Sequence, residues 1–121
     1  TKDGTTIRDF IHVRDLAEIH YKVSKLVLNK RVFFKLNCGY GYGFSVLEIL
    51  KKFAKISKKK INYQFTERRK GDIVISIANP SKIKKIINWK PKHQSLNKLV
   101  KSSLDWYKKT SKINKHKDYL N

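Results

Sequence analysis

The segment GTTIRDFIHVRDL, residues 4–16, decides the fold because it changes from a strand pattern to a helix pattern. Residues 5–13 are rich in β-branched and aromatic side chains, which is typical of a strand. Asp15 and Glu18 have the spacing of a capping box, which predicts Asp15 as the N-cap of a helix. Arg8 and Asp9 interrupt the strand, where charges are costly unless exposed or paired. Because a guanidinium group matches a phosphate, Arg8 is a candidate anion-binding residue.

The rest of the chain predicts an α/β fold in which amphipathic helices alternate with strands of mixed pairing. Apolar spacings of three and four predict helices at 16–28, 46–56, 83–87 and 96–107, and β-rich runs predict strands at 32–38, 61–65 and 73–78. Ser45 and Glu48 form a second capping box, while Ser81 and Ser95 are candidate N-caps. The polar end from Ile113 onward is expected to fray.

The net charge of +20 comes mostly from lysine, since only five of the 29 basic residues are arginine. A basic domain raises the alternative of a nucleic-acid-binding protein. The lysines are scattered through predicted helices and turns, with frequent Asn and Ile, as an AT-rich coding sequence would produce. We therefore expect nucleic acid to bind only nonspecifically, at low salt. The single cysteine, Cys38, indicates a reducing compartment and a cytoplasmic location.

Several patterns suggest chemistry but have simpler interpretations. Gly39, Gly41 and Gly43 precede a predicted helix, but Phe44 occupies the sixth position of the dinucleotide fingerprint, so we interpret them as a tight turn. No apolar run approaches the ~18 residues of a membrane span. The histidines lack neighbouring ligands at metal-binding spacing, which predicts no metal site; they are His12, His20, His93 and His116.

The loop ERRKGD, residues 67–72, follows a predicted strand. Gly71 permits an irregular turn, and an arginine beside the Asp72 carboxylate could hold a diphosphate and its ribose. On composition alone, a solvated basic turn is an equally good interpretation.

Three blocks, at 3–17, 37–46 and 67–72, resemble the extended short-chain dehydrogenase/reductase family, and within it the UDP-glucose 4-epimerases. The resemblance extends from Thr1 to about Tyr107. It implies the C-terminal substrate-binding domain of a two-domain Rossmann-type enzyme. Residues 1–110 would form the nucleotide-sugar-binding domain, and residues 111–121 a flexible basic tail. The start at Thr1 also suggests a fragment.

The resemblance further implies interconversion of UDP-glucose and UDP-galactose through a transient 4-keto sugar. NAD and the catalytic residues would belong to the N-terminal Rossmann half, so this chain alone is expected to be inactive. Arg8 and Arg69 would grip the UDP diphosphate, and Asp72 would bind the ribose. Phe10 replaces a frequent Tyr of epimerases, and Ser76 stands where a Tyr can bound the sugar pocket.

Other expectations also follow from the family. A full-length enzyme could be a homodimer. The pair Tyr21 and Lys25 has the Tyr-x-x-x-Lys spacing of the catalytic couple, but it lies after the block at 3–17 rather than before it, so we reject it as catalytic. The C-terminal part of another nucleotide-sugar dehydratase or decarboxylase remains a further alternative.

Overall fold

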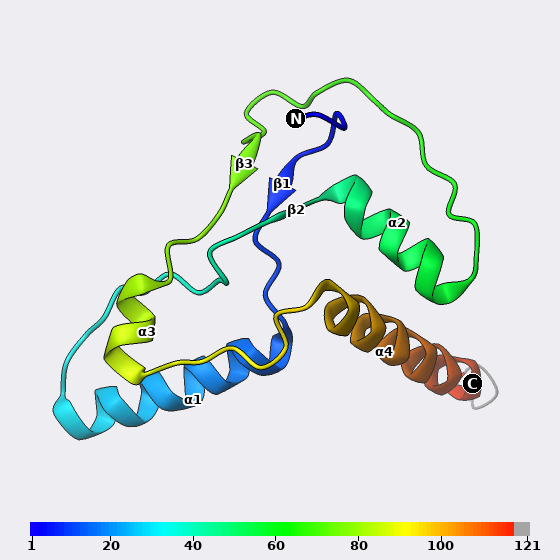
Figure 1. Ribbon diagram of the computed structural model, residues 1–121. Helices are drawn as coiled ribbons and strands as arrows, with labels where there is room; N and C mark the ends of the chain where they lie inside the picture. Colours follow the sequence, from blue (N-terminus) through cyan, green and yellow to red (C-terminus); the bar gives the residue numbers. More distant parts are fainter. Residues whose placement is uncertain (118–121) are drawn as a thin grey trace.

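The computed structural model describes residues 1–117, with side chains through Ser111, and has the expected mixed α/β architecture (Figure 1). Its elements in chain order are β1 (Ile7–Arg8), α1 (Val13–Lys30), β2 (Phe44–Ser45), α2 (Val46–Ser57), β3 (Ile75–Ser76), α3 (Ser81–Ile87) and α4 (Leu96–Lys117). The long loop between α2 and β3 arches over the N-terminal end of the chain (Figure 1).

The sheet is small, and β1 is its central strand. The strand order is β2-β1-β3, with β1 antiparallel to β2 and parallel to β3. Ile7 N donates to Val74 O at 2.9 Å, and Asp9 N donates to Ser76 O at 3.1 Å. The backbone on both sides of Arg8 is therefore bonded to the segment that contains β3.

The beginning of α1 corrects two predictions. His12, rather than Asp15, is the N-cap, and its Nδ1 accepts a hydrogen bond from Arg14 N at 3.1 Å. The predicted strand at 5–13 is reduced to β1 because the chain turns into the helix at Val13. Asp15 lies in the first turn with only 1% of its surface exposed, so its carboxylate serves tertiary contacts rather than a cap.

The second capping box is confirmed at the start of α2. Ser45 Oγ accepts from Glu48 N at 3.0 Å, and Ser45 N donates to the Glu48 carboxylate at 2.6 Å. Asp3 adds a third partner by accepting from Ser45 Oγ. The helix then packs against α4, which runs beside it (Figure 1).

Two of the predicted strands are wrong. Residues 32–38 and 61–65 belong to no ladder among the described residues, and the strand predicted at 73–78 is confined to β3. Phe33 is 96% exposed and Phe65 is 61% exposed. Alternation of apolar and polar residues describes a half-buried surface, but a strand also needs a neighbour to pair with.

The C-terminal third differs from the prediction at the start of α3 and at the end of α4. Pro80, not Ser81, is the N-cap of α3, while Asn79 Oδ1 accepts from Ser81 N at 3.1 Å. Ser95 begins α4 as expected, with its Oγ accepting from Lys98 N at 3.3 Å. The helix continues to Lys117, so residues 113–117 are helical, and residues 118–121 lie outside the described part. The division into 1–110 and a tail at 111–121 stays a prediction.

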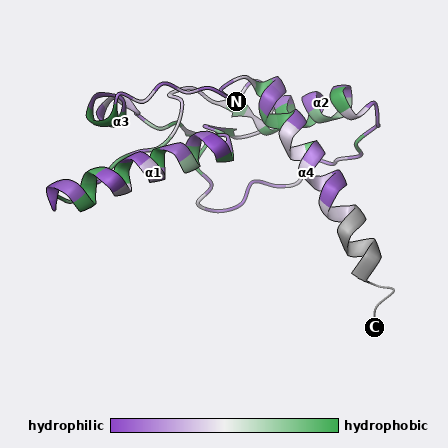
Figure 2. Ribbon diagram, turned by 90° about the horizontal axis from the view of Figure 1, so that it is seen from below, coloured by the Kyte–Doolittle hydropathy of each residue, from purple (hydrophilic) through white to green (hydrophobic). Residues whose placement is uncertain are grey.

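A small core joins α1, α3 and the glycine-rich turn. Ile19, Ile83, Tyr40 and Trp89 are all at most 5% exposed, and the Tyr40 and Trp89 rings stack with centroids 6.1 Å apart. Polar and apolar residues alternate around the helices in Figure 2. Within residues 1–117, no helix combines the length and the apolar character needed to cross a membrane.

We predict that Ser45→Ala lowers the free energy of unfolding by about 1–2 kcal/mol, because it removes the cap of α2. Urea denaturation measures the change. Ser103→Ala is the matched control, since that exposed hydroxyl only bonds back to Leu99 O within α4. Equal stabilities for the two variants would contradict a capping role for Ser45.

Candidate functional site

Arg8 and Ser76 are brought together by strand pairing. They are register partners across β1 and β3, and both line a cavity of about 540 Å³. Asp9, Asn37 and Cys38 lie on the walls of the same cavity. One guanidinium nitrogen of Arg8 donates to Ile7 O at 2.8 Å. The predicted anion-binding arginine therefore lies in a hollow bounded by β1, β3 and the segment before the glycine-rich turn.

Arg69 and Asp72 line a second cavity, of about 390 Å³. Their loop turns at Gly71, whose φ of +87° lies in the left-handed region. Asp72 N donates to Arg69 O at 3.2 Å, and Arg68 Nη2 donates to Asp72 O at 2.7 Å. Arg68 thus braces the turn, and both Arg68 and the exposed Arg69 line the cavity.

The two cavities are neighbours along one strand pair. Thr6 and Val74 line the second cavity, and Arg8 and Ser76 line the first. The pair Thr6 and Val74 lies two residues along the strands from the pair Arg8 and Ser76. The side chains of the two pairs therefore lie on the same face of the sheet, and the pairs are about 7 Å apart. The structure therefore brings four of the five predicted site residues to adjacent hollows. Phe10 is half-buried and lines neither of the two.

Sequence reasoning missed a buried polar network around Asp15. Its carboxylate accepts from Tyr40 Oη at 2.7 Å, from His93 N at 2.9 Å and from Lys92 N at 3.3 Å. His93 Nδ1 also lies 2.8 Å from this carboxylate and donates to it, because an ionised carboxylate only accepts. The network ties the start of α1 to the segment that precedes α4. No local signal in the sequence indicates it, because His93 lies 78 residues from Asp15.

The network sets the charge state of its members. Burial raises the pKa of Asp15. Hydrogen bonds from His93, Tyr40 and two backbone groups lower it by a larger amount, so the pKa of the carboxyl is about 2. Burial, followed by the neighbouring His93, lowers the pKa of His12. Since His12 Nδ1 accepts from Arg14 N, its neutral ring carries the proton on Nε2. Asp15 is thus charged at pH 7, while His12 is held neutral.

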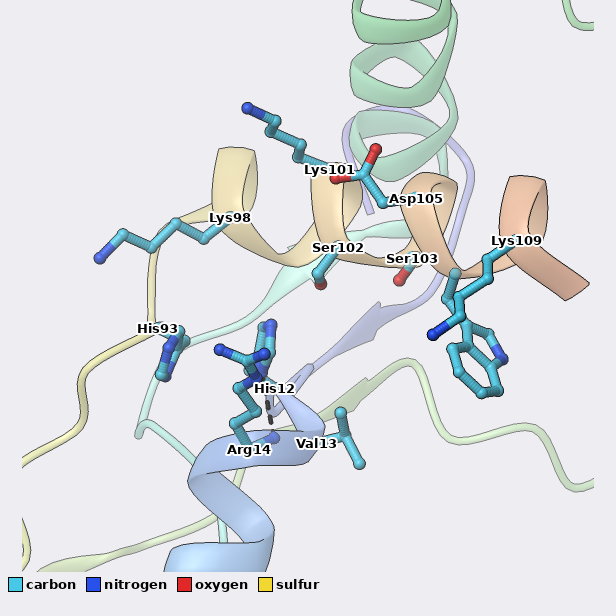
Figure 3. Close-up of a pocket in the computed structure, with 11 residues that line it drawn as sticks. His12, Val13, Arg14, His93, Lys98, Lys101, Ser102, Ser103, Asp105 and Lys109 are labelled. Carbon is cyan, nitrogen blue, oxygen red and sulfur yellow. Dashed lines mark hydrogen bonds between the residues drawn. The ribbon is translucent and has the colours of Figure 1, made fainter.

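A third cavity, of about 590 Å³, lies between the start of α1 and α4 (Figure 3). His12 and Arg14 line one side, and Lys98, Lys101 and Lys109 come from α4. The Lys98 and Lys101 side chains extend away from His12 in Figure 3, and Lys98 Nζ donates to Lys92 O at 2.9 Å. The cations diverge as they do on a solvated basic surface, so we assign no ligand to this cavity.

Other candidate chemistry has structural explanations. Lys25 Nζ lies 4.6 Å from the centroid of the exposed Tyr21 ring, which is a surface cation–π contact. Burial raises the pKa of the Cys38 thiol. Among residues whose side chains are described, no cluster of three His, Cys, Asp or Glu could hold a metal ion. Of the glycines in the predicted tight turn, Gly41 has a φ of +87°, whereas Gly39 and Gly43 do not have positive φ.

The fold is one found in solved nucleotide-sugar epimerases. The structure of UDP-glucose 4-epimerase from Stenotrophomonas maltophila with bound NAD and formylated UDP-arabinopyranose matches 93% of this chain with a TM-score of 0.85 and 33% identity. The Bifidobacterium longum enzyme in complex with NAD+ and UDP matches 90% with a TM-score of 0.76 and 38% identity. These matches cover 33% and 32% of the two solved chains.

More particularly, the sequence is similar to UDP-glucose 4-epimerases over nearly its whole length, which confirms the predicted resemblance. The Bacillus subtilis enzyme is 44% identical over 117 residues, covering 97% of this chain and 34% of the relative. The Dictyostelium discoideum enzyme is 47% identical over 94 residues, covering 77% of this chain and 27% of the relative. No protein-family model matches. The chain thus spans about a third of the length of these relatives.

We predict that Asp15→Asn lowers the free energy of unfolding at pH 7 by about 1.5–3 kcal/mol, because hydrogen bonds to a buried charge are lost. The folded pKa, about 2, lies below the ordinary value of 3.8, so the carboxylate stabilises the fold above pH 4. Urea denaturation should therefore show the difference from wild type shrinking as the pH falls from about 4 to about 2.

The exposed Asp105 provides the control for this prediction, and Asp105→Asn is expected to change stability by less than about 0.5 kcal/mol at pH 7. A difference between wild type and Asp15→Asn that stays constant down to pH 2 would contradict the charged network.

Proposed function

We propose that this chain is the C-terminal, nucleotide-sugar-binding part of a UDP-glucose 4-epimerase. The observation that carries the proposal is the 44% identity to the Bacillus subtilis enzyme over 97% of this chain. Solved epimerases with UDP or a UDP-sugar bound share the fold. In this proposal, the chain supplies the grip on UDP, while the remaining two-thirds of the enzyme supplies the cofactor site and the acid–base groups.

The two adjacent cavities along β1 and β3 support separate binding roles for the residues that line them. Arg69 and Asp72 face one cavity, and an arginine beside a carboxylate suits a phosphate next to the hydroxyls of a ribose. Arg8 faces the other cavity, about two strand residues away, and is assigned to the far side of the diphosphate. Phe10 is assigned to the edge of the substrate site, where it makes no hydroxyl contact.

Ser76 is assigned to the sugar end of the site, because it lies beside Arg8 and presents a small side chain to that cavity. The sugar must turn during epimerisation while the nucleotide stays fixed. A firm hold on UDP with room around the hexose meets both needs, since holding the reactant near the reactive group removes much of the entropic barrier.

The complete enzyme would interconvert UDP-glucose and UDP-galactose with NAD as the hydride carrier. NAD, held by the other part of the enzyme, would supply the hydride acceptor and donor for C4 of the sugar. The residues described in this chain bind and orient the nucleotide, and the catalytic groups belong to the other part. The cytoplasmic location, expected from the single cysteine, and the homodimer, expected from the resemblance, stay predictions.

We predict that Arg69→Ala weakens UDP binding by about 1.5–3 kcal/mol, or roughly 10- to 150-fold, because a charge-assisted phosphate contact is lost. The measurement is isothermal titration calorimetry on a chimera that joins this chain to the other two-thirds of the Bacillus subtilis relative. Conversion of UDP-galactose to UDP-glucose by the same chimera tests the activity.

The control is Lys70→Ala, which removes the same charge from the neighbouring exposed position. We expect it to change the UDP dissociation constant less than about threefold. If the two substitutions weaken UDP binding equally, Arg69 contributes only its general positive charge and makes no specific phosphate contact. Failure of the folded chimera to bind UDP, together with retention on DNA at physiological salt, would favour the basic nucleic-acid-binding alternative.

A further inference from the structure

Asp9 joins the walls of the Arg8 cavity to each other. Its carboxylate accepts from Tyr40 N at 2.9 Å with one oxygen and from Gly41 N at 2.9 Å with the other. Its own N–H donates to Ser76 O at 3.1 Å. A single residue on β1 therefore holds both the glycine-rich turn and β3.

The turn approaches β1 and Asp9 so closely that only glycine fits at two positions. A Cβ atom on Gly39 would lie 2.5 Å from Asp9 Oδ2 and 2.6 Å from Ala78 Cβ. A Cβ on Gly43 would lie 2.6 Å from Ile7 Cγ2 and 2.9 Å from Arg8 O. These glycines serve close approach to β1, and any larger residue would push the turn away from the strand.

The same contact fixes the shape of the cavity. Leu36, Asn37 and Cys38 form the wall opposite Arg8, and they lead directly into Gly39 and the amides held by Asp9. This wall has no ladder hydrogen bonds of its own, because residues 32–38 form no strand. Leu36 and Cys38 pack against the core on the other side. The distance of the wall from Arg8 and Ser76 is therefore set by this packing together with the turn that Asp9 holds.

We propose that Asp9 is a positioning residue. By binding the amides of Tyr40 and Gly41, it holds the wall at 36–38 in place. The wall then lies at the distance from Arg8 and Ser76 that the sugar of a bound nucleotide-sugar requires. The inference rests on the proposed function. It assigns Asp9 a role distinct from that of Arg8, which contacts the phosphate. The Arg69 and Asp72 cavity does not include the wall, so the hold on the nucleotide stays intact when Asp9 is changed.

The test is Asp9→Asn in the chimera with the Bacillus subtilis relative. The amide oxygen of asparagine accepts from one backbone N–H, but its NH2 group faces the other donor, so one of the two bonds is lost. Calorimetry should show the dissociation constant for UDP-glucose rising at least tenfold and that for UDP less than threefold. Asp9→Glu should not restore binding, because Gly39 leaves no room for another methylene group.

The control is Asp3→Asn. Asp3 also accepts from a backbone amide, Thr5 N at 2.9 Å, and from a hydroxyl, Ser45 Oγ, but it lines neither of the two site cavities. It should lower the melting temperature without changing the ratio of the two dissociation constants. A wild-type ratio in Asp9→Asn, or an equal change of the ratio in Asp3→Asn, would overturn the positioning role.

Hydrogen–deuterium exchange of the ligand-free chimera separates this inference from the proposed function. Asp9→Asn should speed exchange in residues 36–41 while residues 46–57 keep the wild-type rate. If the wild-type chimera binds no UDP, the proposed function fails, and unchanged exchange at 36–41 would independently overturn the hold of Asp9 on the wall.

Discussion

The pairing of β1 with two other segments is the constraint on which the arrangement of the site depends. β1 is short, yet it receives β2 on one side and β3 on the other. Side chains along an extended segment alternate between the two faces of the sheet. Thr6 and Val74 therefore line one cavity, and Arg8 and Ser76 line the neighbouring one. A shift of the register by one residue would turn Arg8 to the opposite face and remove it from its cavity.

Two carboxylates, the half-buried one of Asp9 and the buried one of Asp15, extend this constraint to the rest of the chain. Asp9 holds the glycine-rich turn on β1, and Asp15 joins the start of α1 to Tyr40 and His93. Tyr40 takes part in both contacts, since its amide meets Asp9 and its hydroxyl meets Asp15. Its ring also stacks on Trp89 in the core. The site and the core are therefore connected through one tyrosine.

Local features were predictable from sequence, whereas features that need a distant partner were not. The capping box of Ser45 and Glu48 lies within one helical turn, so its spacing was sufficient. Asp15 has equally good cap chemistry, but its partner His93 lies 78 residues away, and the tertiary bonds determine its position. Residues 32–38 and 61–65 alternate as strands do, yet no described segment pairs with them. Likewise, the resemblance predicted Arg8, Arg69 and Asp72 as one site, but only the strand register showed that they face two adjacent cavities.

The most direct measurement of the central claim, that this chain holds UDP along β1 and β3, is hydrogen–deuterium exchange of the chimera with and without UDP. We expect slower exchange in residues 6–10 and 66–76 when UDP is bound, with α4 unchanged. Protection confined to the lysine-rich surface of α4, or no protection in this chain when UDP is bound, would contradict it.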